Sequence, residues 1–256
     1  MFWSDPGLAL APMEGISDAI VRDLLSELGG MDLCVTEFIR VTREPVSRKV
    51  LLRDAPELET GGRTRAGTPV LIQLLGGDPD VVARTATRCV ELGAVGIDLN
   101  FGCPARRVNG SDGGAALLAT PHRVRDVVRA TRRAVPDDRP VSAKIRLGWS
   151  DPDAVDELAR QAHAGGASWI TIHGRTKVQM YRGRADWPRI GRATRAVTTP
   201  VVANGDIFDP AALAACRQAT GAQRFMLGRG AFRVPNLFRW LRGLDTDPWP
   251  PWRSAA

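Results

Sequence analysis

Short apolar runs rich in valine, isoleucine and leucine alternate along this chain with longer stretches in which apolar residues recur every three or four positions. Runs of the first kind are typical of buried strands, and stretches of the second kind are typical of amphipathic helices. The predicted strands cover 8–13, 32–38, 69–76, 96–101, 140–147, 169–175, 201–205 and 224–228. Helices are predicted near 17–28, 45–53, 79–92, 121–134, 153–164, 189–196 and 209–219.

Residues that favour helix ends support these boundaries. Ser17, Thr120, Asp151 and Asp209 precede predicted helices, and Gly29, Gly93 and Gly165 follow others. Eight strands that alternate with helices predict a parallel sheet. The length of 256 residues favours a closed (β/α)8 barrel, a TIM barrel, over the alternative, an open doubly wound sheet. No domain boundary is visible, and 54–68 and 104–120 are predicted to be long loops.

The composition is that of a globular protein with a sizeable core, since 44% of the residues are hydrophobic and 25% are charged. No stretch approaches ~18 uninterrupted apolar residues, so no membrane-spanning helix is expected. The first residues lack the basic and apolar segments of a signal peptide. The four cysteines form no C-x-x-C pair, which argues against a metal site and favours reduced thiols in the cytoplasm.

The formal net charge of +7 comes from arginine, because all but three of the 35 basic residues are arginine. Such an excess is typical of proteins that bind a polyanion such as nucleic acid. The arginines are scattered rather than clustered, so a coding bias towards arginine explains the composition equally well. The charge by itself leaves both interpretations open.

Polar side chains stand at the carboxyl ends of most predicted strands, where the catalytic groups of a (β/α)8 barrel lie. They are Glu14, Gln73, Asn100, Cys103, Lys144, Arg146, His173, Arg175, Asn204, Asp206 and Arg229. Lys144 and Arg146 are two residues apart on one strand and therefore face the same way. Two cations inside a core require an anionic or polar ligand, so this end of the barrel is the predicted active site.

Two features of these strand ends suggest more specific chemistry. Gly205 and Gly228 allow close backbone approach after the last two strands, where this fold often binds a phosphate, and Arg229 adds charge. Cys103 follows its strand in a loop between glycine and proline, unlike the other cysteines, which lie in predicted strands and helices. Its thiol is a candidate nucleophile or acid, or only a small residue that fits a turn.

The segments around these residues resemble the tRNA-dihydrouridine synthase family. The matching segments are LAPMEGISD, VLIQLLG, GIDLNFGCP, NGSDGGAALL, SAKIRLGW, IHGRTKVQMYRGRADW, VVANGDI and FMLGRGA, in this order over nearly the whole chain. The segment DLCVTEFIRV, residues 32–41, is most similar to the bacterial C-type subgroup. The resemblance implies a (β/α)8 barrel that holds FMN, together with a helical domain that helps to bind tRNA.

The resemblance also implies an activity, the reduction of uridine to 5,6-dihydrouridine in the D-loop of tRNA, with NADPH as the electron donor. It implies hydride transfer from reduced FMN to C6 and a proton from Cys103 to C5. The implied FMN contacts are Pro12, Met13, Glu14, Gln73, Lys144 and His173, with Asn204, Gly205, Asp206, Gly228 and Arg229 at the phosphate. Asn100 and Arg146 are expected to orient the uracil, and Arg40 to contact tRNA. We expect a monomer in the cytoplasm that binds tRNA and NADPH and does not bind a membrane.

The predicted barrel ends near residue 231, so we expect an FMN-binding barrel domain over 1–243, a tail over 244–256, and no helical domain. One alternative is a flavin barrel that acts on a free pyrimidine, similar to the dihydroorotate and dihydropyrimidine dehydrogenases. Arg106, Arg107 and the basic excess favour RNA over this alternative. A second alternative, an RNA-binding barrel without catalysis, is disfavoured by the presence of Cys103, Lys144 and His173.

Overall fold

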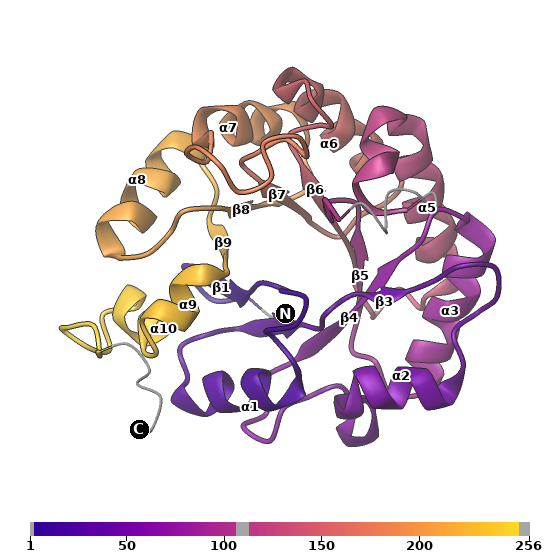
Figure 1. Ribbon diagram of the computed structural model, residues 1–256, viewed down its shortest axis with the longest axis horizontal. Coiled ribbons are helices and arrows are strands. Elements are labelled where there is room, and N and C mark those ends of the chain that lie inside the picture. Colours follow the sequence, from indigo (N-terminus) through magenta and orange to yellow (C-terminus); the bar gives the residue numbers. More distant parts are fainter. Residues whose placement is uncertain (1–2, 106–112, 251–256) are drawn as a thin grey trace.

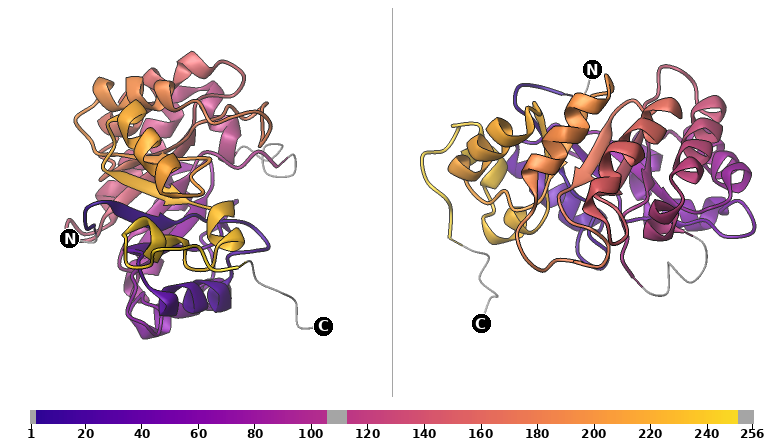
Figure 2. Two further views of the ribbon diagram at one scale, coloured as in Figure 1. Left: turned by 90° about the vertical axis from the view of Figure 1, so that its left-hand side faces the viewer. Right: turned by 90° about the horizontal axis from the view of Figure 1, so that it is seen from above.

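A computed structural model of the chain describes residues 3–105 and 113–250, so Arg106 and Arg107 lie outside the described residues. Eight parallel strands in the described chain form a barrel, and helices surround it (Figure 1, Figure 2). The strands are β1 (Gly7–Leu10), β2 (Leu33–Val35), β4 (Val70–Leu75), β5 (Ile97–Asn100), β6 (Val141–Arg146), β7 (Ile170–His173), β8 (Val201–Asn204) and β9 (Arg224–Leu227). β1 pairs with β2 and β9, and β2 pairs with β4, so the ring closes. The predicted (β/α)8 barrel is confirmed, and the open sheet is wrong.

One additional short strand, β3 (Ile39–Arg40), departs from the prediction of a single strand over 32–38. β2 leaves β4 after Val35, and β3 rejoins β4 further along, at Leu74 and Leu75. Between them the backbone amide of Gln73 donates to Thr36 Oγ1 at 2.9 Å. A side-chain hydroxyl thus takes the place of a ladder carbonyl, and residues 36–38 leave the regular strand geometry.

Side chains alternate along each strand between the helices and the barrel interior. On β6, Val141, Ala143 and Ile145 pack into the core beneath the helices, whereas Lys144 and Arg146 line a cavity inside the barrel. A separate apolar cluster fills the interior below this cavity, with Ala9, Ala11, Leu33, Val35, Leu71, Trp169, Val202 and Met226 as its members. The interior is therefore apolar at one end and polar at the other.

The helices of the described chain follow the strands in the predicted order. They are α1 (Ala19–Leu28), α2 (Arg48–Asp54), α3 (Pro79–Glu91), α5 (Pro121–Ala134), α6 (Val155–Ala164), α7 (Trp187–Ala196), α8 (Pro210–Thr220), α9 (Arg229–Arg233) and α10 (Leu237–Leu241), with 3₁₀ helices η1 (Pro56–Thr60), η2 (Gly114–Ala119) and η3 (Pro152–Ala154). Asp209 caps α8 by accepting from the Ala212 amide at 2.7 Å, as predicted. The predicted cap of α1 is wrong by one residue, because Asp18 caps the helix.

The segment after β9 takes the place of the eighth barrel helix, since α9 and α10 lie between α8 and α1 (Figure 1). Leu237 and Phe238 of α10 are buried. Asp245 accepts from Arg239 at 2.8 Å, which holds the following residues against α10. The division into a domain over 1–243 and a tail over 244–256 stays a prediction. No helix in the described residues has the length and apolar character needed to cross a membrane.

Candidate active site

A cavity of about 510 Å³ opens at the carboxyl ends of the strands, a volume typical of small-molecule sites. Fourteen of the residues predicted for the site line it: Pro12, Met13, Glu14, Gln73, Asn100, Cys103, Lys144, Arg146, His173, Asn204, Gly205, Asp206, Gly228 and Arg229. Arg40, on β3, does not line the cavity, and neither does Arg175, which follows β7. Strand ends that are far apart in the sequence are thus brought to one place.

Asn100 shapes the turn that follows β5. Its Oδ1 atom accepts hydrogen bonds from the backbone amides of Gly102 and Cys103, both at 2.9 Å. Its Nδ2 atom donates to Gln73 Oε1 at 2.8 Å. The amide side chain therefore ends the strand and holds the Cys103 loop, a use that the sequence did not predict.

Cys103 differs from the other three cysteines, because it is partly exposed in the cavity whereas Cys34, Cys89 and Cys216 are buried. Burial raises the pKa of the Cys103 thiol, and the opposing effects of its hydrogen bond to Ala105 and of Arg146 and Lys144 are smaller. The thiol is therefore mostly protonated at pH 7 and is suited to donate a proton rather than to attack as a thiolate.

Lys144 and Arg146 bring positive charge into the cavity wall. Burial lowers the pKa of Lys144 to about 8, and the nearby Arg146 lowers it further while Asp98 opposes this. Lys144 Nζ donates to Asn204 Oδ1 at 3.3 Å, which leaves donor capacity towards the cavity. The pKa of the Lys144 ammonium group therefore lies closer to neutral pH than that of an ordinary lysine.

Arg146 ties two loops together. Its Nε donates to Gly102 O at 2.7 Å, and its Nη1 donates to Met180 O at 2.7 Å and to Thr176 O at 3.1 Å. Its guanidinium carbon lies 5.3 Å from the centre of the Tyr181 ring. Arg146 therefore links the Cys103 loop to the loop between β7 and α7, besides lining the cavity.

His173 is the neutral group among these cations. Burial lowers its pKa well below the usual 6.5, and Arg146, Lys144, Arg175 and Arg229 lower it further. Its Nε2 atom lies 3.4 Å from Arg175 Nη1, which favours the tautomer with the proton on Nδ1. His173 is thus a hydrogen-bonding group at pH 7 and adds no charge.

The ends of β8 and β9 form a cradle of backbone amides. Gly205 has φ 124° and Asp206 has φ 57°, both in the region that favours glycine. Among the hydrogen bonds found between described residues, none is donated by the backbone amides of Gly205, Asp206, Gly228 or Arg229. A Cβ atom on Gly228 would lie 3.2 Å from Met13 Sδ. These amides are available to an anion.

The side chain of Asp206 contacts other groups of the protein. Its carboxylate accepts from Arg175 Nη2 at 2.6 Å, from the Ala185 amide at 2.7 Å and from Arg229 Nη2 at 3.0 Å. A carboxylate repels a phosphate, so Asp206 can serve an anion through its backbone and through the arginines that it orients. Arg229 keeps an exposed guanidinium for direct contact.

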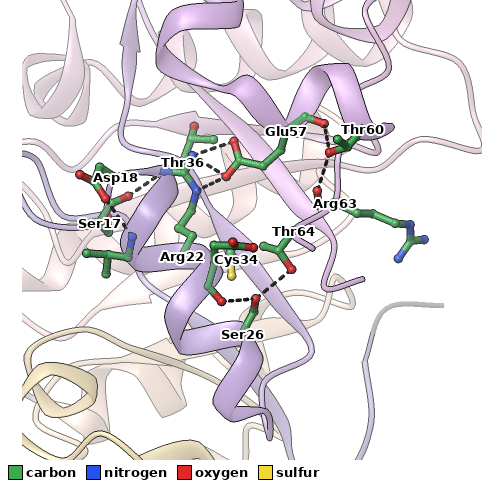
Figure 3. A network of polar contacts seen from close by, with 12 residues as sticks. Ser17, Asp18, Arg22, Ser26, Cys34, Thr36, Glu57, Thr60, Arg63 and Thr64 are labelled. Atoms are coloured by element: carbon green, nitrogen blue, oxygen red, sulfur yellow. Dashed lines mark hydrogen bonds and ion pairs between the residues drawn. The ribbon is translucent and has the colours of Figure 1, made fainter. Parts of the chain in front are cut away.

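The loop after β1 is held from outside the cavity by a buried ion pair. Arg22 donates through Nε and Nη2 to the two carboxylate oxygens of Glu57 at 2.7 and 2.8 Å, and through Nη1 to Ser17 O at 2.7 Å (Figure 3). The Ser17 hydroxyl in turn accepts from the Met13 amide at 2.7 Å. A salt bridge between α1 and η1 thus fixes the position of Met13 in the cavity wall.

Two site residues escaped the sequence prediction. Asp98 is buried inside the barrel beside Gln73, and burial raises the pKa of its carboxyl to about 6. Its signal was present, because it stands two residues before Asn100 and so faces the same way. Tyr181 stands at the cavity mouth with an exposed fraction of 56%, in a loop without any periodic pattern.

The fold and the cavity define a (β/α)8-barrel protein with a buried cationic site and an amide cradle at the carboxyl ends of its strands. A family model for Dihydrouridine synthase (Dus) matches residues 9–255, and the chain belongs to this family. The resemblance inferred from the motifs is thereby confirmed.

Curated relatives are similar over almost the whole chain. A tRNA-dihydrouridine(16) synthase of Haemophilus influenzae is 47% identical over 242 residues, which are 94% of this chain and 78% of that protein. A protein of the same name from Salmonella typhimurium is 47% identical over 243 residues, again 94% and 78% of the two chains. The chain thus spans somewhat more than three quarters of the length of these relatives.

Solved structures with lower identity share the fold. Histamine dehydrogenase from Rhizobium sp. 4-9 has a TM-score of 0.70 at 14% identity, over 92% of this chain and 45% of that one. FabK from Thermotoga maritima has a TM-score of 0.54 at 17% identity, over 91% of this chain and 61% of that one. At these identities the likeness concerns the barrel alone.

Proposed function

We propose that the protein reduces uridine to 5,6-dihydrouridine in the D-loop of tRNA, with FMN as the cofactor and NADPH as the electron donor. The observation that carries this proposal is the cavity itself, which combines a protonated thiol, two cations and an amide cradle. The relatives named above as tRNA-dihydrouridine(16) synthases support the reaction and the substrate.

The residues present fit FMN. The unused backbone amides at the ends of β8 and β9, together with Arg229, are the donors that a phosphate requires. Lys144 and Gln73 supply polar hydrogen-bonding groups to the wall where an isoalloxazine ring with carbonyl and imine acceptors would lie. Pro12, Met13, Glu14 and His173 complete the wall. FMN, when bound, supplies the hydride that is added to C6 of the uracil.

The chain's own groups account for the rest of the reaction. As hydride reaches C6, negative charge develops at the uracil carbonyl oxygen O4, and a proton must reach C5. Cys103 holds a proton at Sγ in the cavity wall and donates it to C5. Lys144 and Arg146 stabilise the developing charge from buried positions in the cavity wall.

The substrate must present a single base to this cavity. The reacting groups line a cavity at the carboxyl ends of the strands, so the uridine must leave the tRNA stack to reach them. Asn100 and Arg146 are the side chains proposed to orient the uracil, and Arg40 is proposed to contact the tRNA outside the cavity. The proposal also includes a monomer in the cytoplasm, where tRNA and NADPH are found.

The test uses purified protein, unmodified tRNA transcripts and NADPH. We expect a yellow protein with visible flavin absorption and dihydrouridine that maps to the D-loop. Free uracil and free orotate serve as matched substrates for the alternative of a free-pyrimidine enzyme. A colourless protein that FMN does not reconstitute, or reduction of a free pyrimidine as fast as tRNA, would contradict the proposal.

A further inference from the structure

We propose that Asp98 is a positioning residue that sets the direction of a hydrogen-bond relay and thereby holds the Cys103 loop in place. The relay runs from Asp98 on β5 through Gln73 and Asn100 to the backbone of Gly102 and Cys103. The kinetic consequence of this inference rests on the proposed function, whereas its geometric part concerns the chain alone.

The first link joins three neighbouring strands inside the barrel. Asp98 is paired with Gln73 of β4 on one side and with Ser142 of β6 on the other. Gln73 Nε2 donates to Asp98 Oδ2 at 2.7 Å, and Ser142 Oγ donates to Asp98 Oδ1 at 2.5 Å. All three side chains are at most 1% exposed. Both carboxylate oxygens are thus occupied by donors.

The direction of the relay follows from the chemistry of its first member. An ionised carboxylate only accepts hydrogen bonds, whereas the amides of glutamine and asparagine can flip end over end. Because Asp98 accepts from Gln73 Nε2, Gln73 must present Oε1 to Asn100, which donates to it at 2.8 Å. Asn100 must then present Oδ1 to the amides of Gly102 and Cys103.

A flip of either amide would place like groups against each other, because a flipped Gln73 would set Oε1 against the Asp98 carboxylate and Nε2 against Asn100 Nδ2. If Asn100 turned its NH₂ group towards the Gly102 and Cys103 amides, both would lose their acceptor. The loop is also held from its carbonyl side, because Arg146 Nε donates to Gly102 O at 2.7 Å. The amide hydrogen bonds and the carbonyl hydrogen bond together fix where the Cys103 thiol lies.

Burying the Asp98 carboxylate inside the barrel costs free energy, because the charge is removed from water. Apolar residues fill the other end of the barrel interior. Burying an apolar residue at position 98 would cost less free energy than burying a charge with two polar neighbours. A carboxylate at position 98 is explained by what an apolar residue cannot do, which is to orient Gln73. This distinguishes a positioning role from a packing role.

The test compares two substitutions that both remove the charge. Asp98→Asn keeps an acceptor for Gln73, because the Asn NH₂ group can face Ser142, whose hydroxyl can rotate to accept. Asp98→Leu keeps the branched shape of the side chain, with larger methyl groups in place of the two oxygens, and keeps no acceptor. The readout is the rate at which iodoacetamide alkylates Cys103 in the substrate-free protein, measured by peptide mass spectrometry. Cys34, Cys89 and Cys216 are buried and report global opening in the same sample.

We expect Asp98→Leu to raise the alkylation rate of Cys103 about tenfold, because a loosened loop exposes the thiol and relieves the burial that raises its pKa. Asp98→Asn should stay within about threefold of the unmodified protein. The inference is overturned if the two variants behave alike, if neither changes the rate, or if all four cysteines accelerate together.

A second variant covers the case in which Asp98→Leu does not fold. Gln73→Met cuts the relay one link later and leaves the bond between Asp98 and Ser142 intact. It should raise Cys103 alkylation by a similar factor, and no change in that rate would also overturn the inference. In the reaction with tRNA, Asp98→Leu should lower kcat with little change in KM. If the unmodified protein forms no dihydrouridine at all, the proposed function fails, while the alkylation rates still decide the positioning role.

Discussion

Arg22 and Arg146 are both buried arginines in the same barrel, and they differ in what they face. Arg22, on α1, has a carboxylate partner in Glu57, with both oxygens hydrogen-bonded to it (Figure 3). Arg146, at the end of β6, donates to the backbone carbonyls of Gly102, Thr176 and Met180, and no ion pair with a carboxylate is found for it among the described residues. One charge is neutralised within the protein, and the other is left for a ligand.

The difference shows how one fold separates stability from function. A buried pair contributes mainly through the cost of breaking it, since either partner alone is an uncompensated charge. Buried cations without a direct carboxylate partner have lowered pKa values, as Lys144 and Arg146 do. Such a site is costly to fold and is ready to stabilise negative charge. The predictions below begin with the largest expected effect.

Glu57→Ala should have the largest effect on stability. It leaves Arg22 buried without its carboxylate, and such a change typically costs about 3–5 kcal/mol in the free energy of unfolding. Urea denaturation of the variant and of the unmodified protein measures this difference. The matched control is the double replacement Arg22→Met with Glu57→Leu, which should be close to neutral because no charge remains. A single variant as stable as the unmodified protein would show that this pair does not stabilise the fold.

Cys103→Ala should have the largest effect on the reaction. Loss of the acid should slow dihydrouridine formation by roughly 10²–10⁴, the usual range for general acid catalysis. Single-turnover rates with tRNA measure this loss. Reduction of the bound FMN by NADPH should be nearly unaffected, because that step does not use the thiol. Cys34→Ala is the control, because Cys34 is buried and should change stability only. An unchanged rate with tRNA would refute the assignment of Cys103 as the acid.

Lys144→Met should change the reaction rate and the stability of the fold in opposite directions. It removes a cation that stabilises developing charge, so the rate should fall about 10²–10³-fold. The free energy of unfolding, in contrast, should rise. The folded pKa of Lys144 is about 8, below its unfolded value, so the charged form is disfavoured by folding. The free energy of unfolding of Lys144→Met should therefore be higher than that of the unmodified protein at pH 7.

The pH dependence of that difference is a sharper form of the same prediction. Between the folded pKa of about 8 and the unfolded value, the unfolded chain binds more protons at Lys144, so stability from this group rises with pH. The advantage of Lys144→Met should shrink as the pH is raised from 8 to 10. Urea denaturation of both proteins at equal cofactor content measures it. If the difference in the free energy of unfolding did not change with pH, folding would not lower the pKa of Lys144.

Arg65→Ala should have the smallest effect. Arg65 pairs with Asp23 and Glu27 on the outside of the barrel, and its side chain is 73% exposed. Solvent screens such pairs, so the unfolding midpoint should stay close to that of the unmodified protein. Thermal unfolding measures it beside Glu57→Ala. A loss as large as that of Glu57→Ala would show that pairing, rather than burial, makes the Arg22 pair important.

Most of the architecture was determined by the sequence alone. The alternation of short apolar runs with amphipathic stretches predicts the eight strands and the order of the helices, because burial on both faces of a strand and on one face of a helix leaves different periods. The same alternation places Lys144 and Arg146 on one face of β6, and parallel strands collect their carboxyl ends at one end of a barrel. Fourteen of the predicted site residues line the cavity for this reason.

Only the tertiary structure decided which groups these side chains contact. Asp98 is 25 residues from Gln73 and 44 from Ser142 in the chain, and Arg22 is 35 from Glu57, so no local pattern marks them as partners. Asn100 and Arg146 bind the loop backbone, a use that depends on how residues 102 and 180 return to the strand ends. Periodicity determines the face on which a residue lies, whereas closure of the barrel determines what it meets there. Asp98 was missed because its importance depends on its neighbours across two strands, and those neighbours are set by register and not by sequence spacing.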